Sequence, residues 1–131
     1  MVTTIGIDPH KATHTAVAID ETETVLGEIT VAADRDQTTR LMEWASRFDG
    51  DGRRWAVEAA GGLGYLLSQQ LVARGEPVVD VPAVLASRVR ALGSGRSDKN
   101  DPNDARSVAI AALRHPALAV VRREDHACLL Y

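Results

Sequence analysis

The 131-residue chain contains a single cysteine, Cys128, and only five aromatic residues. One cysteine excludes an intrachain disulfide framework and any multi-cysteine zinc site. Five aromatic side chains are too few for the base-stacking platform of a single-strand-binding protein. The sequence also lacks a leader pattern and any apolar run of about 18 residues, so we expect a cytoplasmic protein that does not contact a membrane.

Charge is spread unevenly along a chain whose composition is otherwise that of one ordinary globular domain. Residues 1–83 contain seven basic and thirteen acidic residues, whereas residues 84–123 contain eight basic and three acidic residues. A locally basic segment permits a nucleic-acid contact. A solvated helix surface explains the same charge equally well.

The first segment of interest is the apolar run from Val2 to Asp8, which Pro9 ends. It predicts a buried central strand, in which Gly6 leaves room for another backbone or a ligand to come close. Asp8 then lies at the carboxyl end of that strand. In open α/β sheets, ligands and catalytic groups collect at this edge.

The order of the remaining patterns predicts the fold. Strands are expected at 13–19, 24–31, 53–58 and 76–81, and helices at 34–48 (with Asp34 as N-cap), 65–74, 82–92 and 101–113. The first three strands are joined too closely for crossover helices, so they form an antiparallel meander. The pattern favours a ribonuclease H-like α/β fold, with two further parallel strands and flanking helices. There the first and fourth strands are adjacent, which makes Asp8 and Glu58 neighbours.

Four acidic residues are candidate metal ligands. Asp8 and Glu58 end adjacent strands, and Asp101 and Asp104 share one face of the last helix. Converging carboxylates repel one another unless a cation offsets their charge. Oxygen ligands of this number suit Mg²⁺ or Mn²⁺ better than zinc. Two such ions can activate a nucleophile and stabilise the leaving oxygen of a phosphodiester.

Each acid alone also has a structural explanation. Asp8 precedes a proline turn and Glu58 a glycine turn, while Asp101 and Asp104 suit the first turn of a helix electrostatically. The Gly61–Gly64 turn is neither a Walker loop nor a dinucleotide fingerprint. The histidines fit no metal-ligand spacing and are interpreted as surface or packing residues: His10, His14, His115 and His126.

Three segments together resemble the DEDD transposases of bacterial insertion sequences, which are related to Piv-type DNA invertases. The segments are Gly6-Ile-Asp8-Pro-His-Lys11, Val57-Glu58-Ala-Ala-Gly61-Gly followed by Tyr65, and Lys99-Asn-Asp101-Pro-Asn-Asp104-Ala105. The resemblance implies a RuvC-like domain at residues 1–116, and at 117–131 the start of a linker to a C-terminal domain that this chain lacks. It also implies that Asp8, Glu58, Asp101 and Asp104 form the catalytic tetrad that binds Mg²⁺.

The same resemblance implies DNA as the partner. Some members are also guided by an RNA from their own element, and a homo-oligomer is expected of the longer protein. We expect basic residues near the acids to contact phosphates: Lys11, Arg88, Arg90, Arg96 and Lys99. In this family the nucleophilic serine belongs to the second domain, so we expect a truncated chain that binds metal without recombining DNA.

Two other functions stay open from the sequence. The first is a nucleic-acid-binding remnant of the same fold that has lost catalysis. The second is an actin-like phosphotransferase half, because that superfamily shares the strand order and an early strand-ending aspartate. The actin-like alternative predicts nucleotide binding and no role for Asp101 or Asp104.

Overall fold

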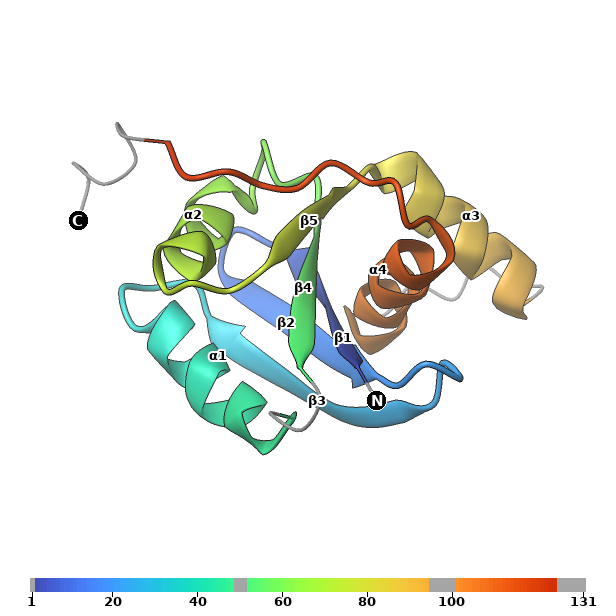
Figure 1. Cartoon of the computed structure of the whole chain (residues 1–131), viewed down its shortest axis with the longest axis horizontal. Helices are drawn as coiled ribbons and strands as arrows, with labels where there is room; N and C mark the ends of the chain where they lie inside the picture. Colours follow the sequence, from blue (N-terminus) through green and yellow to red (C-terminus); the bar gives the residue numbers. More distant parts are fainter. Residues whose placement is uncertain (1, 49–51, 95–100, 125–131) are drawn as a thin grey trace.

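The computed structural model describes residues 2–48, 52–94 and 101–124, except for the side chains of residues 92–94 and 101–103. Five strands form one mixed sheet in the order β3-β2-β1-β4-β5, between two layers of helices (Figure 1). The strands are β1 (Thr3–Pro9), β2 (Thr13–Ile19), β3 (Val25–Ala32), β4 (Arg53–Glu58) and β5 (Val78–Val81). The predicted five-stranded mixed sheet is therefore confirmed.

Pairing within the sheet follows the predicted topology. Strands β1, β2 and β3 form the antiparallel meander, and β4 and β5 continue from β1 in parallel. Strand β5 begins two residues later than the sequence predicted, after Pro77. Proline has no backbone N–H to donate to a ladder, although the Pro77 carbonyl accepts the Trp55 backbone N–H at 2.9 Å.

The helices are α1 (Gln37–Ala45), α2 (Tyr65–Ala73), α3 (Ala83–Ser94) and α4 (Asp101–Arg114), with a 3₁₀ turn at Ser46–Phe48. The prediction that Asp34 caps the first helix is wrong, because α1 begins at Gln37 after Asp36. The Asp34 side chain instead accepts the Asp36 backbone N–H at 2.9 Å and the Arg40 guanidinium at 2.9 Å. Asp34 therefore closes the turn that precedes the helix.

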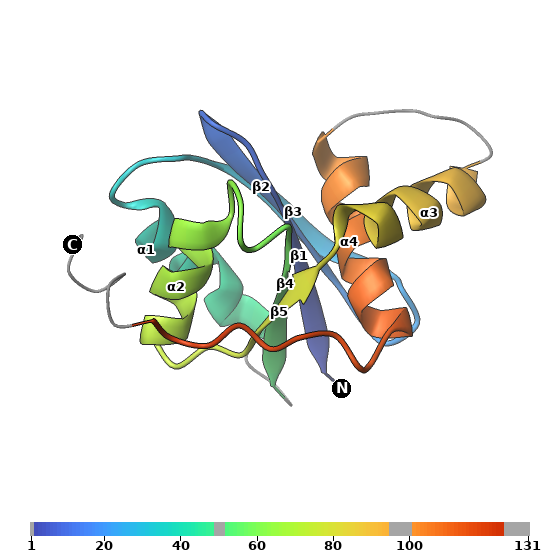
Figure 2. The same cartoon turned by 90° about the horizontal axis from the view of Figure 1, so that it is seen from above.

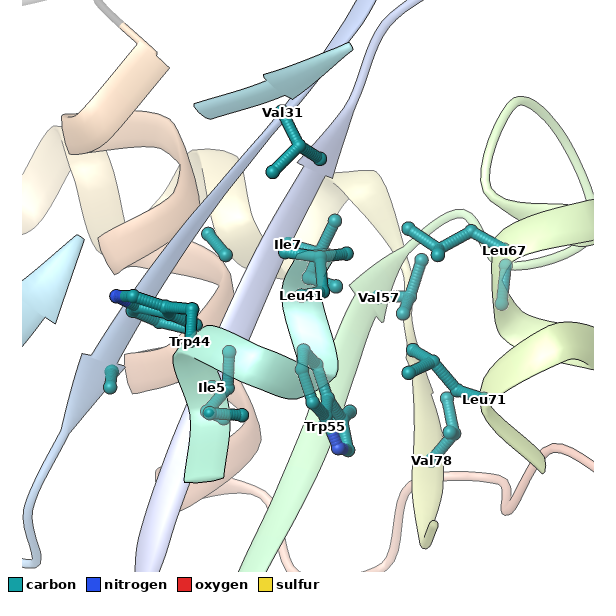
Figure 3. Packing of buried hydrophobic residues seen from close by; sticks show 14 residues of the cluster. Ile5, Ile7, Val31, Leu41, Trp44, Trp55, Val57, Leu67, Leu71 and Val78 are labelled. Atoms are coloured by element: carbon teal, nitrogen blue, oxygen red, sulfur yellow. The ribbon is translucent and has the colours of Figure 1, made fainter. Parts of the chain in front are cut away.

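Helices α1 and α2 cover one face of the sheet. Successive strand residues point to opposite faces, so Ile5, Ile7, Trp55 and Val57 all point to this side. Figure 3 shows them packed against helix residues such as Leu41. All five of these side chains are inaccessible to solvent.

Helices α3 and α4 cover the other face (Figure 2). Helix α4 lies directly on β1 at Gly6, where an added Cβ would be 2.2 Å from the carbonyl oxygen of Ala105 and 2.5 Å from the backbone nitrogen of Ala109. The prediction that Gly6 admits another backbone is confirmed. That backbone belongs to α4, the helix that carries the acidic residues Asp101 and Asp104.

Two arginine side chains hold the C-terminal end of α4. Arg54 on β4 donates from Nη2 to the carbonyl oxygen of Ala112 at 3.0 Å. Arg114 donates two hydrogen bonds of 2.8 Å to the carboxylate of Glu23. Together with the contact at Gly6, they set the position of α4 on the sheet.

Residues after α4 run along the edge strand β5, as Figure 2 shows. The carbonyl of Ala119 accepts the Asp80 backbone N–H at 2.9 Å, and Val121 donates to the carbonyl of Val78 at 2.8 Å. Gln69 of α2 holds the same segment through the carbonyl of Arg122 at 2.8 Å. Part of the segment assigned to a linker thus packs on the domain, and a boundary at residue 116 stays a prediction.

Across the described part of the chain, every helix is too short or too polar to span a membrane.

Candidate active site

Asp8 and Glu58 end two adjacent parallel strands. Ile7 of β1 pairs with Val57 of β4, so the next residue on each strand follows side by side. Both side chains point to the α4 face, because Ile7 and Val57 point to the opposite one. Asp8 is 6% exposed and Glu58 is half-buried. The fold therefore brings these two predicted site residues together.

The carboxyl groups of Asp8 and Glu58 shift each other's pKa. The pKa of Glu58 is raised to about 7 by burial, by the negative charge of Asp8, by a hydrogen bond with Asp8 and by the charge of Asp104. Burial also raises the pKa of Asp8, although the hydrogen bond with Glu58 and the neighbouring His10 act to lower it. The raised pKa of Glu58 means that Glu58 holds its proton more tightly than an ordinary glutamic acid does, because a second negative charge beside Asp8 is unfavourable.

Asp104 of α4 is the third acid of the site. Its charge raises the pKa values of both Asp8 and Glu58, which requires that it lie near them. Its Oδ1 accepts a hydrogen bond of 2.6 Å from Nη1 of Arg90 on α3. The side chains of Arg90 and Asp104 are 19% and 18% exposed, so this ion pair is largely shielded from water.

Asp101 begins α4, but its side chain lies outside the described residues. Among the side chains that are described, no three His, Cys, Asp or Glu residues are grouped so that they could hold a metal ion. The described arrangement is a carboxyl pair with Asp104 close by and bound to Arg90. A cluster of four carboxylates therefore stays a prediction.

Of the five predicted phosphate-binding residues, the structure places Arg90 at the acids. Lys11 and Arg88 are exposed. Arg96 and Lys99 lie outside the described residues.

His10 is a neighbour of Asp8 that the sequence analysis missed. Its Nε2 lies 2.9 Å from Oδ2 of Asp8, while its side chain remains 46% exposed. The signal was available, because residues two apart at the end of a strand point to the same face. A surface histidine beside a buried carboxylate can fix the orientation of that carboxylate.

The turn after Glu58 is held in a strained conformation. Ala59 has a φ of +49°, in the left-handed region that L residues other than glycine rarely adopt. The backbone N–H of Ala60 donates to Oδ1 of Asp80 at 2.8 Å, which ties the turn to β5. This turn fixes where β4 stops, and so where Glu58 lies relative to Asp8.

Two solved structures of Thermus thermophilus RuvC share the fold. One, a complex with Holliday junction substrate, superposes with a TM-score of 0.66 at 18% identity, covering 92% of this chain and all of that chain. The other gives a TM-score of 0.63 at 17% identity, covering 91% of this chain and 99% of that chain. At these identities the likeness shows the fold alone, and it confirms the ribonuclease H-like architecture.

Sequence comparison identifies the family. The chain is 37% identical over 105 residues to an uncharacterized 44.8 kDa protein of insertion element IS116 from Streptomyces clavuligerus. That match covers 80% of this chain and 26% of the relative, so the chain spans about a quarter of the relative's length. The family of DEDD transposases typified by IS110 matches residues 5–130. The chain therefore belongs to the IS110-family DEDD transposases.

Proposed function

We propose that this chain is the metal-binding catalytic domain of a DNA transposase, and that its carboxylates support phosphodiester strand exchange. The observation that carries the proposal is that the carboxyl groups of Asp8 and Glu58 lie together at the ends of adjacent strands. Family membership favours this function over the actin-like alternative.

The donor set fits a hard divalent cation. Burial and mutual repulsion raise the pKa values of Asp8 and Glu58, so the cation-free protein holds them together at a cost. A cation between their oxygens would remove that cost. Oxygen-only ligands select Mg²⁺ or Mn²⁺ rather than zinc. Asp8 and Glu58 would form the base of the site, with Asp104 and Asp101 supplied by α4.

Each residue has a distinct task in this proposal. A divalent ion held by these residues would supply Lewis acidity for attack on a phosphodiester. Asp8 and Glu58 orient the ligand oxygens from rigid strand ends. His10 holds Oδ2 of Asp8 in place from the solvent side. Helix α4 covers the site on its face of the sheet, because Gly6 allows the backbone of α4 to come close to β1.

DNA is the proposed substrate. The residue 84–123 segment carries eight basic and three acidic residues, and Arg90 lies beside the acids. The solved RuvC structure of the same fold contains a Holliday junction substrate. A guide RNA from the element and a second copy of the longer protein remain further proposed partners. The resemblance implies that strand exchange needs a serine of a second domain, so we expect these 131 residues by themselves to bind metal and DNA without strand exchange.

The test is calorimetric titration of the 131-residue chain with Mg²⁺ and Mn²⁺, supported by thermal unfolding with and without the ion. We expect saturable binding that Asp8→Asn and Glu58→Gln each abolish. Glu28→Gln is the matched control, because Glu28 is an exposed carboxylate on β3. Ion binding should raise the melting temperature of wild type and of the control only, by mass action. Equal binding by all four proteins would exclude this site.

A further inference from the structure

Arg90 is the cation that faces the acidic site from α3. Its Nη1 lies 2.6 Å from Oδ1 of Asp104, and both side chains are mostly buried. Its positive charge also acts to lower the pKa of Glu58, so its influence extends to the carboxyl pair. Arg90 therefore already supplies part of the compensating charge that a metal ion would supply.

The guanidinium of Arg90 and a divalent ion compete for the carboxylate of Asp104. A carboxylate that accepts a short hydrogen bond from arginine has one oxygen committed to it. Two cations held a few ångströms apart also repel each other strongly where water is largely excluded. Binding of a metal by Asp104 thus opposes the contact that Arg90 makes in this structure.

We propose that Arg90 is an internal counter-ion, which holds Asp104 in the metal-free protein and transfers to a substrate phosphate when the metal binds. This inference rests on the proposed function, because it takes Asp104 as a metal ligand. A guanidinium donates to carboxylate and phosphate oxygens alike, so a phosphate oxygen can replace Oδ1 of Asp104 as the acceptor of the Nη1 hydrogen bond. Arg90 also contacts Ser87 Oγ at 3.3 Å, one turn earlier on α3, which gives the side chain a second anchor during the exchange.

The exchange has two thermodynamic consequences. Removing Arg90 should tighten metal binding, because the ion no longer displaces a bound cation. Metal and DNA should also bind cooperatively, because metal binding releases Arg90 to contact a phosphate. This coupling is reciprocal, so DNA should strengthen metal binding by the same factor. The proposal therefore separates Arg90 from an ordinary surface arginine, for which metal and DNA binding are independent.

The first experiment compares Arg90→Gln with Arg88→Gln in the 131-residue chain. Arg88 lies on the same helix and is exposed, so its variant matches the change in net charge. We expect Arg90→Gln to bind Mg²⁺ about fivefold or more tightly than wild type in calorimetry, whereas Arg88→Gln matches wild type. We also expect Arg90→Gln to melt at a lower temperature in EDTA, and saturating Mg²⁺ should reduce that difference. A purely structural role predicts the same loss with and without Mg²⁺.

The second experiment measures binding of a short DNA duplex by fluorescence anisotropy, in EDTA and in Mg²⁺. We expect Mg²⁺ to strengthen DNA binding by wild type and Arg88→Gln more than by Arg90→Gln. Arg90→Lys keeps the charge but not the planar guanidinium with its several donors, and it should be intermediate in both experiments. It also serves as the test variant if Arg90→Gln does not fold.

The proposed function and the counter-ion exchange of Arg90 have separate tests. If wild type binds no divalent ion, the proposed function is wrong and this inference is wrong with it. If wild type binds Mg²⁺ but Arg90→Gln binds it equally or more weakly, only the counter-ion exchange is wrong. Equal enhancement of DNA binding by Mg²⁺ in wild type and Arg90→Gln would also overturn it.

Discussion

Gly6 sets the distance between helix α4 and the central strand, so Gly6→Ala should disturb fold and site together. An added Cβ would lie 2.2 Å from the carbonyl oxygen of Ala105, 2.5 Å from the backbone nitrogen of Ala109 and 2.8 Å from the Cβ of Ala109. None of these atoms is the end of a flexible side chain. The clash can be relieved only if α4 moves away from β1.

The size of the effect follows from the geometry. Restoring an ordinary contact requires α4 to withdraw by ~1 Å, which loosens the apolar contacts on both sides of Gly6. Overpacking of a rigid core typically costs 1–3 kcal/mol, and two helix backbone atoms at one position place this case at about 3 kcal/mol. For a chain of this length, that corresponds to a fall in melting temperature of about 10 °C. Asp104 precedes Ala105 and should move with it.

The assay is urea unfolding followed by circular dichroism, paired with calorimetric titration of Mg²⁺. Gly61→Ala is the matched control, because a Cβ there meets no atom within 4 Å. We expect Gly61→Ala to unfold like wild type and to bind Mg²⁺ normally, and Gly6→Ala to be weakened in both respects. If Gly6→Ala unfolds within about 1 kcal/mol of wild type, the inference that close helix packing positions Asp104 is wrong.

Three further predictions concern stability. Because the pKa of Glu58 is raised from 4.5 to about 7, the folded state binds its proton more tightly than the unfolded state. In EDTA, the free energy of unfolding of wild type should therefore fall as the pH rises from about 4.5 to about 7, and that of Glu58→Gln should fall less. Identical pH profiles of urea unfolding for the two proteins would contradict this. Ala59→Gly should stabilise by about 0.5 kcal/mol, because glycine tolerates the φ of +49°, and a lower urea midpoint would count against the strain. Glu76→Ala should lower the free energy of unfolding by about 2 kcal/mol. The reason is that Glu76 Oε1 accepts hydrogen bonds of 2.7 Å from both Trp55 Nε1 and Arg53 Nε. An unchanged midpoint of urea unfolding would refute this.

Strand periodicity predicted most of the sheet, because β1 and β2 are buried almost throughout and β4 is buried at its apolar centre. The segments 13–19 and 53–58 alternate or run apolar between turn signals, and β2 and β4 have those bounds. The start of α1 was less predictable, since Asp34, Asp36 and Gln37 all suit the first turn of a helix. In the structure Asp34 lies in the turn before α1 and forms an ion pair with Arg40. No local sequence pattern indicates this ion pair.

Strand order made Asp8 and Glu58 predictable as neighbours, because both end parallel strands that the topology places together. The partner of Asp104 was not predictable in the same way. Arg90 and Asp104 belong to different helices, and their contact depends on how α3 packs against α4. The sequence predicted Arg90 as a phosphate contact near the acids, whereas the structure shows it bound to one of the acids. The contact of His10 with Asp8 was not predicted because His10 fits no metal-ligand spacing, whereas its position two residues after Asp8 puts it on the same face.

Repulsion between the acids of the site opposes the packing of α4 against the sheet. The charge of Asp104 raises the pKa values of Asp8 and Glu58, so bringing α4 to the sheet costs free energy when no metal is bound. That cost must be offset elsewhere on the helix. The apolar face of α4 is fully buried at Ala105, Val108, Ala109, Ala111 and Ala112, and Arg54 bonds its last turn at Ala112. The free energy that brings the acids together therefore comes from the rest of α4 and from the ion pair that Asp104 makes with Arg90.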